Sequence, residues 1–195
     1  MNSTILFFTF CAYLLGSIPF AILIGVLFYK TDVRKQGSGN PGATNTFRIL
    51  GKKAGISVLI LDASKGFFPV YLGSLYFNDP FLLLLGGASV LGHCFSPFLK
   101  GKGGKGIATL LGTALAFDWS LALVCITIFI FLLCLFRYVS LASLVAIFSY
   151  GILGIFVFKH QNLSFLIFGF SSMILTLYTH RKNLKSLLAG KENKI

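Results

Sequence analysis

The first segment with side chains suited to ligand binding runs from Gly37 to Arg48. Its glycines and proline favour defined turns, and Ser38, Asn40 and Asn45 supply hydroxyl and amide groups. The guanidinium of Arg48 presents a planar fork of donors that fits a phosphate. An ordinary polar loop is the simpler interpretation, but a shorter turn would be enough to connect two helices. We therefore expect this segment to bind a ligand.

The second segment lies between residues 101 and 109 and mixes lysines with glycines at positions Gly101, Gly103, Gly104 and Gly106. Neighbouring glycines let backbone N–H groups converge on an anion, and a helix that begins after them adds the partial positive charge of its N-terminus. Lys105 is followed by Gly106, where a P-loop requires Ser or Thr. The pattern predicts a phosphate cradle of another kind. The alternative is a flexible turn whose lysines only mark the cytoplasmic side.

The third segment follows the last apolar run and contains His180 and Asn183, which share one face of a helix at i, i+3 spacing. A histidine at the mouth of a membrane protein can move a proton or bind a substrate hydroxyl. Leucines at the next helical positions form an apolar stripe. The alternative is therefore an interfacial helix that holds anionic lipids.

One Asp, one Lys and one His lie inside apolar runs. Asp62 and Lys65 are one helical turn apart, so we expect them to form an ion pair that lowers the cost of placing both in a membrane. His93 precedes the lysine-rich second segment. It is expected either to pack with a hydrogen-bond partner or to line the site.

Composition places these segments in a membrane protein. Of the 195 residues, 56% are hydrophobic and 11% are charged, whereas about 25% are charged in a typical soluble domain. This excludes a soluble enzyme, a disordered chain and a secreted disulfide scaffold. The four cysteines are isolated within apolar runs and are expected to be packing residues. The long continuous apolar runs predict an all-α, polytopic membrane protein, with residues 1–195 forming a single integral-membrane domain.

Seven apolar segments are long enough to be considered as transmembrane helices, although the fourth is short for a crossing at about 16 Å. They are Ile5–Tyr29, Ala54–Phe77, Phe81–Leu99, Ile107–Phe117, Trp119–Phe136, Tyr138–Phe158 and Leu163–Tyr178. With seven crossings, every Lys and Arg except Lys65 and Lys159 lies on one side. The positive-inside rule then predicts an outside N-terminus and a cytoplasmic C-terminus, with the active site on the cytoplasmic side.

The charge balance limits the possible partners and chemistry. Lys and Arg total 17 against 5 Asp and Glu, giving a net charge of +12, which favours an anionic substrate or lipid surface over nucleic acid. The carboxylates are scattered singly, so no metal cluster, no paired acid and base, and no cofactor site is predicted. An enzyme built this way must act by positioning and electrostatics on a substrate that is already activated.

Together these segments resemble a known enzyme family. Gly37–Arg48, Lys102–Thr109, His180–Glu192 and Leu15–Phe20 are similar in order and spacing to the bacterial acyl-phosphate:glycerol-3-phosphate acyltransferase family (PlsY). The resemblance covers essentially the whole chain. It implies an integral membrane enzyme of the cell membrane that transfers a fatty acyl group from acyl phosphate to the 1-hydroxyl of glycerol 3-phosphate. The product would be lysophosphatidic acid for phospholipid biosynthesis, made without a metal or cofactor.

The resemblance also implies roles for particular residues. Ser38, Arg48 and Lys105 would clamp the glycerol phosphate, with the four glycines of the second segment holding phosphate through their N–H groups. His180 and Asn183 would lie near the reacting hydroxyl. Further pocket-lining residues would be Asn40, Asn45, Lys65, His93, Thr109, Ser140 and Ser143.

Other functions are less consistent with the sequence. A transporter or channel for a small organic phosphate would need polar residues near mid-membrane on several spans and access from both sides. A non-catalytic protein that binds anionic lipids would not need the ordered first segment. A CDP-alcohol phosphotransferase would need clustered aspartates, which this chain lacks.

Overall fold

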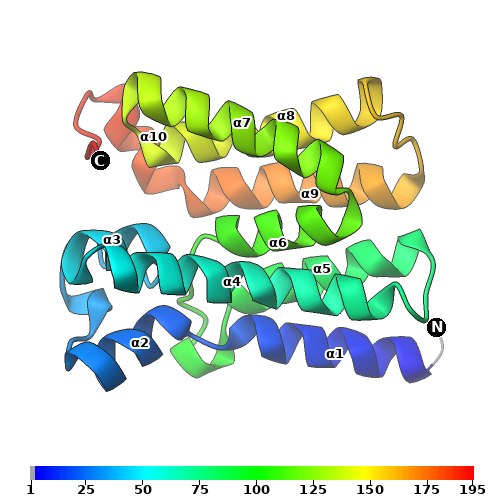
Figure 1. Cartoon of the computed structure of the whole chain (residues 1–195), viewed down its shortest axis with the longest axis horizontal. Coiled ribbons are helices and arrows are strands. Elements are labelled where there is room, and N and C mark those ends of the chain that lie inside the picture. Colours follow the sequence, from blue (N-terminus) through cyan, green and yellow to red (C-terminus); the bar gives the residue numbers. More distant parts are fainter. Residues whose placement is uncertain (1–2) are drawn as a thin grey trace. The chain divides into compact units, whose positions relative to one another are not determined.

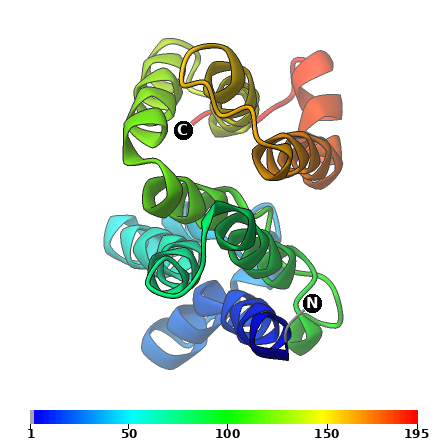
Figure 2. The ribbon, with the colours of Figure 1, turned by 90° about the vertical axis from the view of Figure 1, so that its right-hand side faces the viewer.

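The computed structural model describes residues 3–195, and every regular element in that range is helical (Figure 1). This confirms the predicted all-α class. The helices form two compact units, one ending at Phe117 and the other beginning at Asp118. In each unit the long helices run alongside one another, as the view in Figure 2 along their axes shows.

The first unit contains six α-helices and two short 3₁₀ turns, η1 (Val33–Lys35) and η2 (Pro97–Leu99). The α-helices are α1 (Ser3–Ser17), α2 (Phe20–Tyr29), α3 (Ala43–Leu50), α4 (Lys52–Gly73), α5 (Asp79–Cys94) and α6 (Ile107–Phe117). Helix α4 packs on α6, and α1 packs on α5.

Glycines make both helix pairs possible. A Cβ on Gly66 or Gly112 would overlap the backbone of the facing helix in the α4–α6 pair, and a Cβ on Gly16 or Gly92 would do the same in the α1–α5 pair. Small residues of this kind are typical of helix contacts in membranes, where close approach of the backbones replaces hydrophobic driving force.

The second unit contains α7 (Trp119–Phe136), α8 (Val139–Phe156), α9 (Leu163–Thr179) and α10 (Arg181–Leu188). Asp118 caps α7 by accepting from the N–H groups of Ser120 and Leu121, and its other oxygen lies 2.7 Å from Nε2 of His160. Burial alone would raise the pKa of Asp118, but hydrogen bonds from His160 and the cap outweigh it, and the pKa is lowered. The connection before α9 is thereby tied to the start of α7.

Each predicted apolar segment corresponds to helical structure. Four helices have the length and hydropathy to cross a membrane, and two bent pairs, α1 with α2 and α9 with α10, raise the number to six if each pair is one span. Helix α6 has 11 residues, as expected, and is shorter than these. Seven crossings therefore remain a prediction.

Candidate active site

The first segment is folded around the side chain of Asn45. Only the first half of this segment is a loop, because α3 begins at Ala43 and carries Arg48 in its last turn. The amide nitrogen of Asn45 donates to the carbonyls of Val33 (2.8 Å) and Gln36 (3.3 Å), and its oxygen accepts from the N–H of Ser38 (2.9 Å). Asn45 is 1% exposed. Its polar atoms therefore hold the loop in shape, and the pocket-lining role expected from the sequence stays a prediction.

The loop held by Asn45 leaves the Ser38 and Arg48 side chains exposed. Gly37 and Gly39 have φ values of +59° and +70°, which favour glycine. The hydroxyl of Ser38 accepts a long hydrogen bond of 3.4 Å from the N–H of Asn40. The loop therefore presents the hydroxyl of Ser38 to the surroundings, and helix α3 presents the guanidinium of Arg48.

The first and second segments meet at a cavity of about 450 Å³ within the first unit. Its walls include apolar side chains and three cationic residues; they are Arg34, Gly39, Pro41, Phe98, Leu99, Lys100 and Lys102. Arg34 is held by Asp32 in a 2.7 Å ion pair, and this hydrogen bonding lowers the pKa of Asp32 to about 2. The two segments predicted to bind anions are thus neighbours in space.

The second segment uses most of its glycine N–H groups within the protein. Gly101 donates to the carbonyl of Ser96 (2.9 Å), Gly103 to that of Cys94 (3.0 Å) and Gly104 to that of His93 (3.1 Å). A hydrogen already donated to a carbonyl is not available for an anion. The role of these three glycines in holding a phosphate stays a prediction, and their N–H groups have carbonyl partners in the structure.

The start of α6 offers better anion donors. Gly106, with φ +83°, directs the chain into α6, whose first intrahelical hydrogen bond runs from the N–H of Leu110 to the carbonyl of Gly106 (2.8 Å). The N–H groups of the first helical turn have no partner within the helix. Lys105 lies two residues before Ile107, the first residue of this turn. Thr109 lies in it, fully buried, and its hydroxyl has no hydrogen-bond partner among the residues the structure describes.

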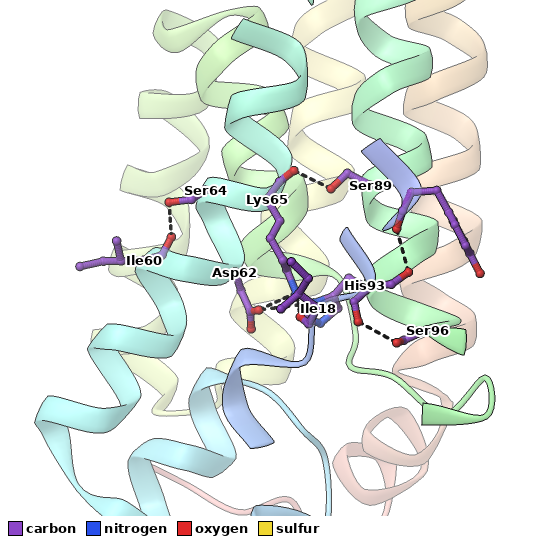
Figure 3. A network of polar contacts seen from close by, with 10 residues as sticks. Ile18, Ile60, Asp62, Ser64, Lys65, Ser89, His93 and Ser96 are labelled. Carbon is purple, nitrogen blue, oxygen red and sulfur yellow. Dashed lines mark hydrogen bonds and ion pairs between the residues drawn. The ribbon is translucent and has the colours of Figure 1, made fainter. Parts of the chain in front are cut away.

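Three buried ionisable residues of the first unit, Asp62, Lys65 and His93, form one cluster (Figure 3). Lys65 Nζ lies 2.8 Å from Oδ1 of Asp62, which confirms the predicted ion pair. It also lies 2.9 Å from Nδ1 of His93, so His93 is a packed residue with a polar partner. The cluster is joined to the second segment because His93 also receives the hydrogen bond from Gly104.

In the second unit, His180 stands where α9 ends and α10 begins. Its Nδ1 lies 3.0 Å from the carbonyl oxygen of Thr176. A carbonyl only accepts, so this contact requires the proton on Nδ1 and makes Nε2 of the neutral ring an acceptor. The imidazole is oriented by a backbone carbonyl in the role that a carboxylate often has.

Asn183 is oriented by a residue that we did not single out from the sequence. Oε1 of Glu192 accepts from Nδ2 of Asn183 and from the hydroxyl of Ser140, each at 2.7 Å. Ser143 lies one turn further along α8 and is buried. Glu192 is the only carboxylate after Asp118 in the sequence, and that isolation in a basic segment was the available signal. Within residues 3–195, no group of three or more His, Cys, Asp or Glu residues could hold a metal ion.

The glycerol-3-phosphate acyltransferase family model matches residues 6–190. The chain belongs to this family. A glycerol-3-phosphate acyltransferase of Fusobacterium nucleatum is 44% identical over 192 residues, which cover 96% of each chain. One from Thermotoga petrophila is 41% identical over 189 residues, covering 96% of this chain and 95% of the relative.

Solved structures of the family extend the similarity to three dimensions. The crystal structure of PlsY (YgiH), an integral membrane glycerol 3-phosphate acyltransferase, in its glycerol 3-phosphate form is 39% identical with a TM-score of 0.94, covering 99% of this chain and 96% of that one. Its lysophosphatidic acid form is 38% identical with a TM-score of 0.91 and the same coverage. This acyltransferase is therefore an integral membrane enzyme, as predicted, and the transporter alternative is excluded.

Proposed function

We propose that this acyltransferase moves a fatty acyl group from acyl phosphate to the 1-hydroxyl of glycerol 3-phosphate. The hydroxyl oxygen forms the new ester bond to the acyl carbon, and the bond from that carbon to the phosphate oxygen breaks. Lysophosphatidic acid and inorganic phosphate are the products. The support is family membership over nearly the whole chain, together with a related PlsY structure in glycerol 3-phosphate and lysophosphatidic acid forms.

Cationic groups and a helix N-terminus are proposed to bind the phosphate of glycerol 3-phosphate. Ser38 and Arg48 contribute from the loop and helix that Asn45 organises. Lys105 and the first-turn N–H groups of α6 contribute from the second segment, since an anion is stabilised at a helix N-terminus. We propose that these charges do the work that a metal ion does in many phosphate-binding enzymes, and that no metal is required.

His180 and Asn183 are proposed to hold the reacting hydroxyl. The observation that carries this proposal is the contact between His180 Nδ1 and the Thr176 carbonyl, which makes Nε2 an acceptor suited to a hydroxyl. Because acyl phosphate is a mixed anhydride with a good leaving group, the hydroxyl needs little activation. We propose that the bound hydroxyl donates to Nε2 of His180, and that its hydrogen turns to the departing phosphate and is transferred to it as the new ester bond forms, so that His180 acts by positioning.

A direct assay tests the reaction. Purified protein is incubated with labelled glycerol 3-phosphate and either acyl phosphate, acyl-coenzyme A or acyl carrier protein as the acyl donor, with and without a metal chelator. We expect lysophosphatidic acid only with acyl phosphate, at a rate that the chelator does not change. Product from acyl-coenzyme A but not from acyl phosphate, or loss of product with the chelator, would contradict the proposal.

We also propose that the enzyme lies in the bacterial cell membrane with its N-terminus outside and its C-terminus and active site on the cytoplasmic side. The distribution of Lys and Arg supports this orientation. Residues 1–195 are proposed to work as one acyltransferase domain, since the family model extends over both compact units.

A further inference from the structure

The buried ammonium of Lys65 is surrounded by acceptors from three directions (Figure 3). It donates to the carbonyl of Ile18 at 2.8 Å, contacts Nδ1 of His93 at 2.9 Å and forms an ion pair with Asp62 at 2.8 Å. Lys65 and Asp62 are each 2% exposed. A lysine ammonium has three N–H donors and no acceptor. The contacts with Ile18 and His93 and the ion pair with Asp62 therefore hold it in one place.

This arrangement fixes the ring of His93. Because the ammonium of Lys65 can only donate, Nδ1 of His93 must accept, and the neutral imidazole carries its proton on Nε2. His93 is 8% exposed and its Nδ1 edge cannot turn away without leaving Lys65 short of an acceptor. The Nε2 edge therefore points in a defined direction.

That edge lies against the backbone of Gly104. A Cβ placed on Gly104 would overlap Nε2 of His93 and contact the two neighbouring ring carbons. The same stretch of chain is attached to the end of α5 by two hydrogen bonds, from Gly104 to the carbonyl of His93 and from Gly103 to that of Cys94. The imidazole is therefore held rigidly and packs against Gly104, the residue that precedes Lys105.

We propose that His93 is a positioning residue for the acyl-transfer reaction. Held by Lys65 and Asp62, its ring fixes the position of the Gly104 backbone and thereby places Lys105 and the start of α6. It is assigned no contact with substrate. Gly104 is a glycine, on this inference, because the His93 ring leaves no room for a Cβ. The inference rests on the proposed role of Lys105 and the α6 N-terminus in binding the phosphate of glycerol 3-phosphate.

A double-mutant cycle between Gly104→Ala and His93→Asn tests this arrangement. Asparagine keeps an acceptor close to the position of Nδ1 for Lys65 but removes the Nε2 edge of the ring. KM for glycerol 3-phosphate, KM for acyl phosphate and kcat are measured for the parent, both single variants and the double variant, together with the melting temperature in detergent. Gly103→Ala, alone and with His93→Asn, is the matched control.

In the parent, Gly104→Ala should raise KM for glycerol 3-phosphate by about 10-fold or more, because a misplacement of about 1 Å can cost up to about 100-fold. KM for acyl phosphate should change less. In the His93→Asn background the added effect of Gly104→Ala should fall below about 3-fold, since the obstructing ring is gone. Gly103→Ala should not be relieved, because its Cβ would overlap the backbone carbonyls of His93 and Cys94, which remain.

An equal effect of Gly104→Ala on KM in both backgrounds would overturn the inference. So would coupling that is confined to the melting temperature, which would make His93 a purely structural residue. If His93→Asn is recovered too poorly to assay, His93→Gln serves in the same cycle, since a flexible amide can move aside where the ring cannot. Lys105→Ala is measured in parallel. An unchanged KM for glycerol 3-phosphate in Lys105→Ala would contradict the proposed phosphate contact of Lys105. The double-mutant cycle tests the coupling between His93 and Gly104 separately.

Discussion

Replacement of His180 by Gln and by Asn separates positioning from proton transfer. In the structure Nδ1 of His180 donates to the carbonyl of Thr176, so Nε2 is the nitrogen that can meet a hydroxyl. The amide of Gln reaches about as far as Nε2 and can accept a hydrogen bond there. The amide of Asn reaches only about as far as Nδ1, so it preserves the contact with Thr176 but not the contact with the hydroxyl.

The two mechanisms differ in expected magnitude. If His180 only positions the hydroxyl, the loss is at most that of one imperfect hydrogen bond, about 0.5–1.5 kcal/mol, or about 2- to 13-fold in kcat/KM for His180→Gln. If His180 is the general base, removing it costs about 100- to 10,000-fold. We expect His180→Gln to remain within about 13-fold of the parent and His180→Asn to fall further, close to His180→Ala.

The assay is formation of labelled lysophosphatidic acid across a range of pH, with single-turnover rates to show that product release does not limit the reaction. The acid limb of the pH–rate profile should persist in His180→Gln, because the titrating group is then the substrate phosphate. If His180→Gln is as inactive as His180→Ala while the chemical step limits the rate, the positioning mechanism is refuted and His180 is the base.

Three further predictions concern other parts of the molecule. Arg48→Ala and Lys105→Ala should each lower kcat/KM for glycerol 3-phosphate by about 10- to 150-fold while the protein still folds and inserts, since a charge-assisted contact contributes about 1.5–3 kcal/mol. Near-parent kinetics would remove that residue from the site. Asp118→Asn keeps an oxygen for the cap of α7 but removes the charge facing His160. Because the pKa of Asp118 is lowered in the folded state, the ionised carboxylate stabilises the fold at pH values above its usual pKa of 3.8. This stabilisation is lost as the pH falls through the lowered pKa. The melting temperature of Asp118→Asn should therefore lie below that of the parent at pH 7, and the difference should disappear at acid pH. In a cysteine-free background, an impermeant thiol reagent added outside the cell should label a cysteine at Gln161 and spare one at Asn193, and the reverse pattern would overturn the proposed orientation.

Local sequence signals were sufficient for elements whose boundaries are set by neighbouring residues. Helix α7 has the predicted bounds, because the capping residue Asp118 stands directly before an uninterrupted apolar run. The pairing of Asp62 with Lys65 also followed from spacing within one helix. Both depend on residues only a few positions apart.

Contacts between distant positions could not be read in this way. The loop role of Asn45 depends on the carbonyl of Val33, 12 residues earlier, and the pairing of Ser140 with Glu192 spans 52 residues. Helix α3 was missed because half of its eight residues are polar, and Thr44, Asn45 and Thr46 near its start have modest helix propensity. The glycines of the second segment showed that close approach was required there, but not that the approaching group is the ring of His93.

The internal hydrogen bonds of the second segment have a thermodynamic consequence for substrate binding. Because Gly101, Gly103 and Gly104 already donate to carbonyls of the chain, the segment holds its shape without substrate. Ordering a flexible loop on binding would cost about 1–2 kcal/mol for each residue fixed. Here that entropy is lost during folding, so binding of a small anion retains more of its interaction energy. A substrate with as few atoms as glycerol 3-phosphate depends on such preorganisation for useful affinity.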